Sequence, residues 1–118
     1  DQVYLDGAHN PHAMLRLIEF AKSLAGKRVK ILFGALKRKD YSGMLQTLQA
    51  GLPEAELILT TFHYGEVVAQ GDRQDLPYVA DYKAYIKEFM DQSRPDEVLF
   101  VTGSLYFIAE VRAFLLEG

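Results

Sequence analysis

Polar side chains that can do chemistry gather in four short segments, each of which follows a predicted strand. The segments are 6–10, 34–40, 60–63 and 102–104. Ligands of parallel sheets bind outside the carboxyl ends of the strands, so these segments are expected to meet at one edge of a sheet. We call the edge made by the four segments the rim, and we expect the binding site to lie there.

The first segment places a carboxylate, Asp6, at a strand end and an imidazole, His9, three residues later. A carboxylate in this place can accept hydrogen bonds from ribose hydroxyls, and a histidine beside a helix N-terminus can face phosphate oxygens. The same residues also fit a structural role, in which Asp6 ends the strand, Asn10 caps the next helix and His9 is solvated. The residue types alone leave both interpretations open.

Three consecutive cations, Lys37, Arg38 and Lys39, occupy the second segment. They could hold the carboxylates of an acidic substrate or the phosphates of a nucleotide, and a solvated basic loop is equally compatible with their charge. In the fourth segment Ser104 has the position of a helix N-cap, and its hydroxyl can also bind an anion. A nucleophilic role for Ser104 is not expected, because the sequence positions no histidine to activate it.

Sequence patterns for metal and triphosphate binding are absent from the chain. The spacing matches no known metal site, so no metal ligands are predicted among Asp6, His9, His63 and Asp81. The chain has neither a G-x-x-x-x-G-K-[ST] loop nor a G-x-G-x-x-G after its first predicted strand. We therefore expect the chain alone to be inactive toward nucleoside triphosphates.

The composition is that of one compact domain covering residues 1–118. Of the 118 residues, 49% are hydrophobic and 25% are charged, which suffices for one core and excludes a disordered chain. Lysine and arginine number 13 against 16 aspartates and glutamates, and the net charge of −3 argues against general nucleic-acid binding. Every apolar run is too short to cross a bilayer, so no membrane partner is expected.

Two further features bear on where the protein works. The sequence contains no cysteine, which fits a reducing cytoplasm and excludes disulfides and thiolate chemistry. It also opens directly on the strand-like segment 1–6, without an initiator methionine or a signal segment. We expect a cytoplasmic protein, and a chain that is one piece of a longer one.

Hydrophobic periodicity predicts strands that alternate with helices along the chain. Strands are expected at 3–5, 29–33, 57–60, 78–80 and 98–101. Helices are expected after N-caps at Asn10, Asp40, Asp81 and Ser104. Gly26 is expected to end the first helix in a left-handed conformation, and segment 62–76 has no clear pattern. The alternation is typical of a three-layer, Rossmann-like α/β domain, with helices on both faces of a mostly parallel sheet of five or six strands. It allows for one antiparallel edge strand.

Three motifs occur in order along the chain: D-G-A-H-N-P at 6–11, G-A-L-K-R-K-D at 34–40 and V-T-G-S-L-Y at 101–106. In order and spacing they resemble the folylpolyglutamate synthases, including the bifunctional dihydrofolate synthase form, of the Mur ligase superfamily. The resemblance extends over almost the whole chain and matches the C-terminal domain of that family.

The resemblance implies an activity and a role for each candidate residue. ATP would phosphorylate a carboxylate of folate or dihydropteroate, and the amine of L-glutamate would attack the acyl phosphate. Asp6 would contact the ATP ribose, and His9 would act in catalysis beside the phosphates. Lys39 and Ser104 would receive glutamate or the reacting carboxylate, with Lys37 as a second candidate. Most Mg²⁺ ligands and the P-loop would lie in an N-terminal ATPase domain, so this chain is not expected to bind ATP or Mg²⁺ tightly by itself.

The chain departs from the family pattern at two places. Arg38 stands where the family usually has aspartate, which leaves the roles of Lys37 and Lys39 open, and segment 62–64 lacks the basic residue expected there. Two other classes of α/β domain are compatible with this pattern of strands and helices. A phosphoacceptor receiver domain would need an acidic pair near the first strand end and an aspartate after the third, where Thr60 and Thr61 stand. A non-catalytic α/β binding domain stays open as an alternative.

Overall fold

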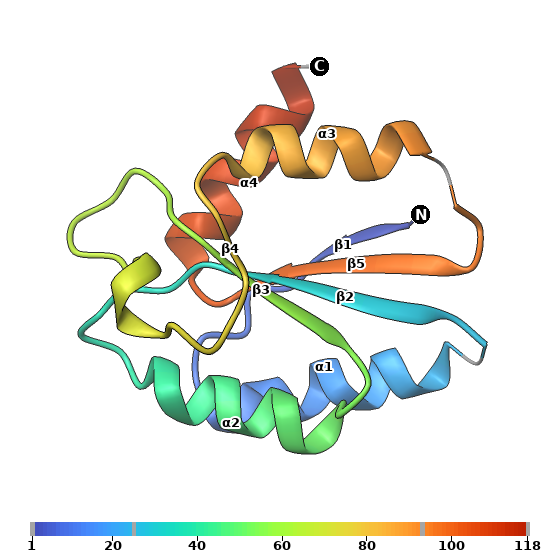
Figure 1. Ribbon diagram of the computed structural model, residues 1–118, viewed down its shortest axis with the longest axis horizontal. Helices are drawn as coiled ribbons and strands as arrows, with labels where there is room; N and C mark the ends of the chain where they lie inside the picture. The colour runs from blue at the N-terminus through green and yellow to red at the C-terminus, as the bar shows by residue number, and fades with distance from the viewer. Residues whose placement is uncertain (1, 25, 93, 118) are drawn as a thin grey trace.

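The computed structural model describes residues 2–24, 26–92 and 94–117. A five-stranded sheet with the order β1-β5-β2-β3-β4 lies at its centre (Figure 1). The strands are β1 (Val3–Leu5), β2 (Arg28–Phe33), β3 (Glu56–Thr60), β4 (Tyr78–Val79) and β5 (Glu97–Thr102). The helices are α1 (Pro11–Ser23), α2 (Tyr41–Gly51), α3 (Tyr82–Gln92) and α4 (Leu105–Glu117), with a short 3₁₀ helix, η1, at Gln70–Asp72.

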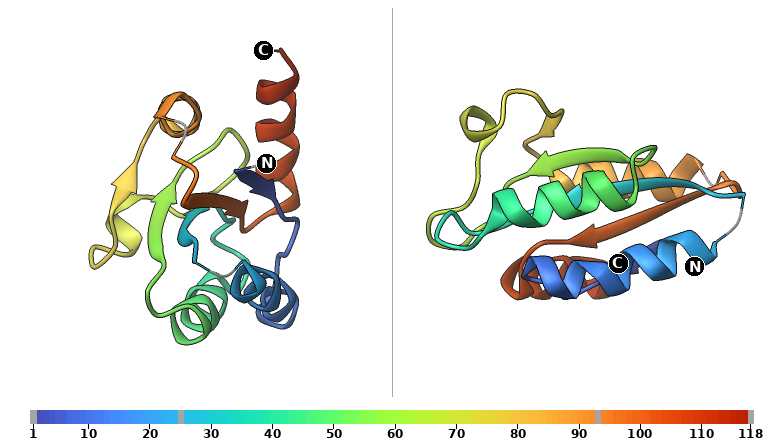
Figure 2. Two further views of the ribbon diagram at one scale, coloured as in Figure 1. Left: turned by 90° about the vertical axis from the view of Figure 1, so that its right-hand side faces the viewer. Right: turned by 90° about the horizontal axis from the view of Figure 1, so that it is seen from below.

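Two helices cover each face of the sheet, so the molecule has three layers (Figures 1 and 2). One core lies between the sheet and α1 and α2, around Met14, Leu45 and Phe100. The other lies between the sheet and α3 and α4, where Ile86 and Phe107 are fully buried. The predicted three-layer α/β architecture is therefore confirmed. Within the described ranges no helix is both long enough and apolar enough to cross a bilayer.

Strand β5 is an interior strand of the sheet, between β1 and β2. All six of its residues are buried, and it pairs in parallel with β1 on one side and with β2 on the other. Burial on both faces explains its unbroken apolar run at 98–101, from which a central strand was predicted. The carboxylate of Glu97, at the start of β5, lies 3.1 Å from the guanidinium of its register partner Arg28. A slip of β5 by one residue along β2 would separate these two side chains, so the contact favours the observed register.

The structure corrects two predictions about the elements. Among the described residues all five strands are parallel, so the antiparallel edge strand that the sequence allowed is not found; β4 joins β3 in parallel after a long connection. Antiparallel pairing between described residues is limited to one isolated bridge, Leu36 to Val67. Helix α1 ends at Ser23 with Leu24 as its C-cap, so Gly26 does not end the helix, although its φ is +79°.

The loops after β2 and β5 touch through two glycines. Gly103 has a φ of +121°, and a Cβ added to it would lie 2.4 Å from the carbonyl oxygen of Gly34. The Gly34 N–H donates to the carbonyl oxygen of Thr102 over 3.0 Å, which continues the β2–β5 pairing into the loops. A glycine at 103 is therefore required both by its backbone conformation and by this contact.

We predict that Gly103→Ala lowers the free energy of unfolding by about 3 kcal/mol, because it adds backbone strain and a clash with the Gly34 backbone. The matched control is Gly71→Ala, since a Cβ at Gly71 meets nothing within 4 Å. Urea denaturation of both variants measures the difference. A Gly103→Ala variant as stable as the control would contradict the close approach of the two loops.

Candidate functional site

A cavity of about 440 Å³ lies at the rim, where the loops after β1, β2 and β5 meet. We call it the rim pocket; its lining residues are His9, Leu36, Arg38, Lys39, Gly103, Ser104, Leu105 and Tyr106. Three of the five predicted site residues, His9, Lys39 and Ser104, line it together, each from a different loop. The sequence argument that strand ends converge at one rim therefore agrees with the structure for these three.

His9 is held by the backbone of its own loop. Its Nδ1 lies 3.0 Å from the carbonyl oxygen of Gly7. A carbonyl can only accept, so Nδ1 carries a proton in this contact, and Nε2 is the ring atom left for a ligand. The loop is tied to β5 as well, because the Thr102 hydroxyl donates to the carbonyl oxygen of Ala8 over 3.3 Å.

Asp6 lies on the rim but does not line the pocket. Its Oδ1 accepts a hydrogen bond from the N–H of Ala8 over 2.8 Å, which shapes the turn after β1. Asn10 caps α1 by accepting from the N–H of Ala13 over 2.8 Å. The structural role expected for Asp6 and Asn10 is thus present, and a second Asp6 oxygen is left to accept from a ligand.

The three cations of the second segment have different surroundings. Lys37 Nζ lies 3.6 Å from the carboxylate of Asp72 and outside the pocket. Arg38 and Lys39 are exposed and line the pocket, and no carboxylate among the described residues forms an ion pair with either. The structure therefore brings Lys39, rather than Lys37, beside His9 and Ser104, and it gives the pocket a positive charge.

Ser104 is buried at the start of α4, with 4% of its surface exposed. Its Oγ accepts from the N–H of Tyr106 over 3.1 Å, so the predicted N-cap role is confirmed. A hydroxyl that accepts one hydrogen bond still has a proton to donate. Ser104 can therefore cap the helix and donate to an anion in the pocket at the same time.

Sequence reasoning missed a pair of stacked tyrosines at the pocket. Tyr106 lines it, and the ring of Tyr64 stacks on Tyr106 with centroids 3.8 Å apart and planes 13° from parallel. A hydrogen bond with Tyr106 raises the pKa of Tyr64, while the charge of nearby Arg38 acts in the opposite direction. No sequence signal joins these residues, since Tyr64 lies in the stretch without a clear pattern.

Sequence reasoning also missed a cluster built on Glu110 of α4. Its Oε2 accepts from the Tyr82 hydroxyl over 2.8 Å and lies 3.1 Å from His63 Nδ1, while its Oε1 accepts from the His63 N–H over 3.0 Å. Burial raises the pKa of Glu110, but these hydrogen bonds outweigh it and hold that pKa below 4.5. Burial and the bond to Glu110 raise the pKa of Tyr82.

No group of three or more histidine, aspartate and glutamate side chains among the described residues is arranged to hold a metal ion. The four residues weighed as metal ligands are accordingly not assembled. His63 and Asp81 line a separate cavity after β3 and β4, whereas His9 lines the rim pocket.

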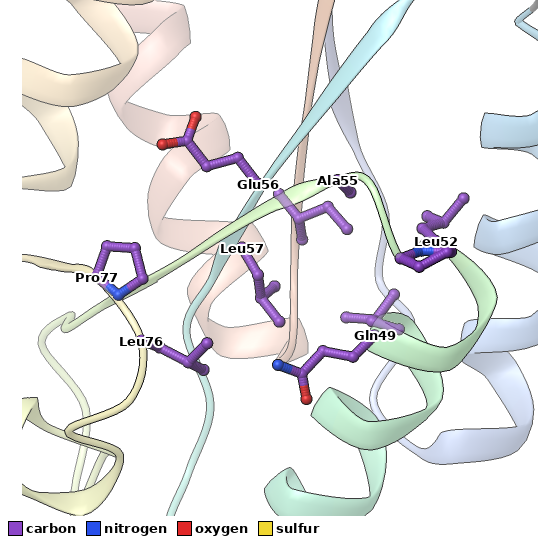
Figure 3. A pocket seen from close by; sticks show the side chains of 10 residues that line it. Gln49, Leu52, Ala55, Glu56, Leu57, Leu76 and Pro77 are labelled. Carbon is purple, nitrogen blue, oxygen red and sulfur yellow. The ribbon is translucent and has the colours of Figure 1, made fainter.

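Another cavity, at the start of β3, is unsuited to chemistry. It lies between the end of α2 and the segment before β4, and most of its lining is apolar (Figure 3). Gln49 and Glu56 are the polar side chains in its lining. In Figure 3 the Glu56 carboxylate points to the side of β3 away from Gln49, so these two polar side chains do not converge in the cavity. The rim pocket is therefore the candidate site.

We predict that Glu110→Gln lowers the free energy of unfolding by about 1 kcal/mol at neutral pH, because the carboxylate accepts three hydrogen bonds. In the folded protein the pKa of the Glu110 carboxyl lies below its ordinary value of 4.5. The carboxylate therefore contributes fully to stability above pH 4.5, and this contribution is lost as the pH falls through the lower, folded-state pKa. The difference in Tm between the wild type and the variant should shrink accordingly in acid.

Circular dichroism melts between about pH 3 and pH 7 measure this difference. Glu19→Gln, on the exposed surface of α1, is the control and should show little effect at any pH. If the difference in Tm between the wild type and Glu110→Gln stays constant over this pH range, the assigned charge state of Glu110 is contradicted.

Three comparisons relate this geometry to known proteins. The family model described as "Mur ligase, glutamate ligase domain" matches residues 1–105. The chain is 31% identical to a dihydrofolate synthase/folylpolyglutamate synthase of Bacillus subtilis, over 93% of this chain and 27% of that protein. The chain therefore spans about a quarter of the length of this relative.

Solved structures share the fold. A ligand-free bifunctional folylpolyglutamate synthase/dihydrofolate synthase of Yersinia pestis superposes with a TM-score of 0.78 at 27% identity, covering 95% of this chain and 29% of that one. A second structure of such an enzyme, with Mn, AMPPNP and L-glutamate bound, superposes with a TM-score of 0.80 over 98% of this chain and 30% of that one. Its identity is 24%, so it shows the common fold alone.

Proposed function

The chain belongs to the Mur ligase, glutamate ligase domain family. From this premise we propose that it is the C-terminal domain of an ATP-dependent ligase that adds L-glutamate to folate or dihydropteroate through an acyl phosphate. The observation that carries the proposal is the convergence of His9, Lys39 and Ser104 in one positively charged pocket at the rim. The Bacillus subtilis relative, a dihydrofolate synthase/folylpolyglutamate synthase, supports the choice of reaction.

The pocket offers groups that suit anions. Lys39 and the Ser104 hydroxyl can bind the carboxylates of the incoming glutamate, since each supplies a donor beside the same cavity. His9 presents Nε2, which donates to a phosphate oxygen when the ring is protonated. Negative charge builds up as the acyl phosphate forms and is attacked, and donors placed in advance stabilise it.

ATP and its Mg²⁺ would be held mainly by another part of the ligase. Arg38, Lys39 and Ser104 in the pocket lining are hydrogen-bond donors, which suit phosphate and carboxylate oxygens. Asp6, with one oxygen engaged by Ala8, would bind the ribose from outside the rim pocket. In this proposal the domain closes over ATP bound to an N-terminal ATPase domain and excludes water from the acyl phosphate. The enzyme would work in the cytoplasm, where ATP is supplied.

We predict that Lys39→Ala or Ser104→Ala, made in the full-length ligase, raises the KM for L-glutamate by about ten- to a hundredfold. The loss of one charge-assisted hydrogen bond has this effect on binding. The KM for ATP should stay within about threefold of the wild-type value, because these residues would face the amino acid rather than the nucleotide. Steady-state kinetics with each substrate varied in turn measures both constants.

Lys37→Ala is the matched control, because it removes the same charge from the same loop at a position paired with Asp72. Its effect on the KM for L-glutamate should be smaller than that of Lys39→Ala. An ATP defect equal to or larger than the glutamate defect in both Lys39→Ala and Ser104→Ala would contradict the proposed roles. A full-length protein without glutamate ligase activity would contradict the function itself.

A further inference from the structure

The rim pocket has an aromatic side that neither glutamate nor a phosphate needs. Tyr106 lines this side, and the Tyr64 ring stacks on Tyr106 from outside the lining; we call these two rings the aromatic wall. Tyr64 is 41% exposed and Tyr106 46% exposed, and the neighbouring Leu105, also in the pocket lining, is 55% exposed. Exposed aromatic surface at the edge of a cavity is available to contact the apolar part of a ligand.

The aromatic wall is held in place from behind. His63, the residue before Tyr64, is bound to Glu110 through both its backbone N–H and its imidazole. Glu110 lies one helical turn after Tyr106 on α4, and the hydroxyl of Tyr82 fixes its carboxylate. The loop after β3 is therefore attached to α4 at two successive turns, so the two rings are positioned before any ligand arrives. A preformed surface loses less entropy on binding.

Groups that bind carboxylates lie on the same pocket as the aromatic wall. Arg38 shares its lining with Tyr106 and, unlike Lys39 and Ser104, is not assigned to the incoming glutamate. Aromatic side chains bind a planar ring by stacking, and the Arg38 guanidinium can bind an anionic group attached to it. The combination therefore fits an aromatic ring that carries a carboxylate, directly or through a short chain.

We propose that the aromatic wall binds the aryl ring of the acceptor, the p-aminobenzoyl ring. This ring carries the receiving carboxylate directly in dihydropteroate and through one glutamyl unit in folate. This inference rests on the proposed function and adds to it a contact between this domain and the acceptor. The adenine ring of ATP and the pterin ring of the acceptor are the other planar groups in the reaction. The aryl ring is favoured because Arg38, a cation without an ion pair among the described residues, lines the pocket beside Tyr106, and of the three rings the aryl ring lies nearest to the carboxylate of the acceptor.

The test uses ring removal and ring retention at the same position in the full-length ligase. Tyr106→Leu should raise the KM for dihydropteroate or folate by about three- to tenfold, while Tyr106→Phe stays close to the wild type. Tyr64→Leu should act in the same direction, and its melting temperature checks that it folds. Leu116→Ala, 81% exposed near the other end of α4, is the control for a change on that helix and should leave all constants unchanged.

A second measurement is independent of catalysis. In NMR spectra of the 118-residue chain, millimolar p-aminobenzoylglutamate should shift the ring protons of Tyr64 and Tyr106, and adenosine should not. A shift with adenosine alone, or a KM defect confined to ATP, would assign the aromatic wall to the nucleotide and overturn the proposal. Unchanged constants in Tyr106→Leu would also overturn it. A wild-type ligase without activity would instead contradict the proposed function, leaving the NMR titration to decide this inference.

Discussion

The parallel pairing of β5 with β1 on one side and β2 on the other is the constraint on which the site depends. In this register Leu5 lies beside Val101, and Phe33 lies beside Thr102, so three strands end at the same level. Their loops must then turn in a small volume, and Gly103 permits the closest approach, to Gly34. His9, Lys39 and Ser104 are far apart in the sequence. They meet because β1, β2 and β5 end side by side at the same edge of the sheet.

Local charge, and not net charge, gives the rim its chemistry. The whole chain carries −3, yet Arg38 and Lys39 place positive charge on the pocket. Lys37 contributes little to it because Asp72 lies beside its ammonium group. At the opposite end of the sheet, the cations near Glu97 are paired with that buried carboxylate and support the register instead. Unpaired donors at the rim are the groups that can stabilise a developing anion.

Most of the fold could be predicted from the sequence because the signals are local. Caps at Asn10, Asp40 and Asp81 and the apolar run at 98–101 each identify an element without knowledge of its partners. The direction of the edge strand stayed open because β4 follows the connection through 62–76, which has no periodicity; the structure shows it parallel to β3.

The site could be predicted only in part, for the same reason. Strand ends identified His9, Lys39 and Ser104, since their place on the rim follows from the order of the elements. The choice between Lys37 and Lys39 depends on Asp72, which lies in the unpatterned stretch. The contacts of Tyr64 with Tyr106 and of His63 with Glu110 join residues more than forty positions apart, so no local pattern could reveal them.

The most direct test of the account is a crystal structure of the full-length ligase with a non-hydrolysable ATP analogue, Mg²⁺ and L-glutamate bound. The account predicts that the rim faces the nucleotide, with His9 at the phosphates and the glutamate carboxylates on Lys39 and Ser104. A closed complex in which glutamate and phosphates are bound entirely by other residues, with the rim pocket turned away from them, would contradict it.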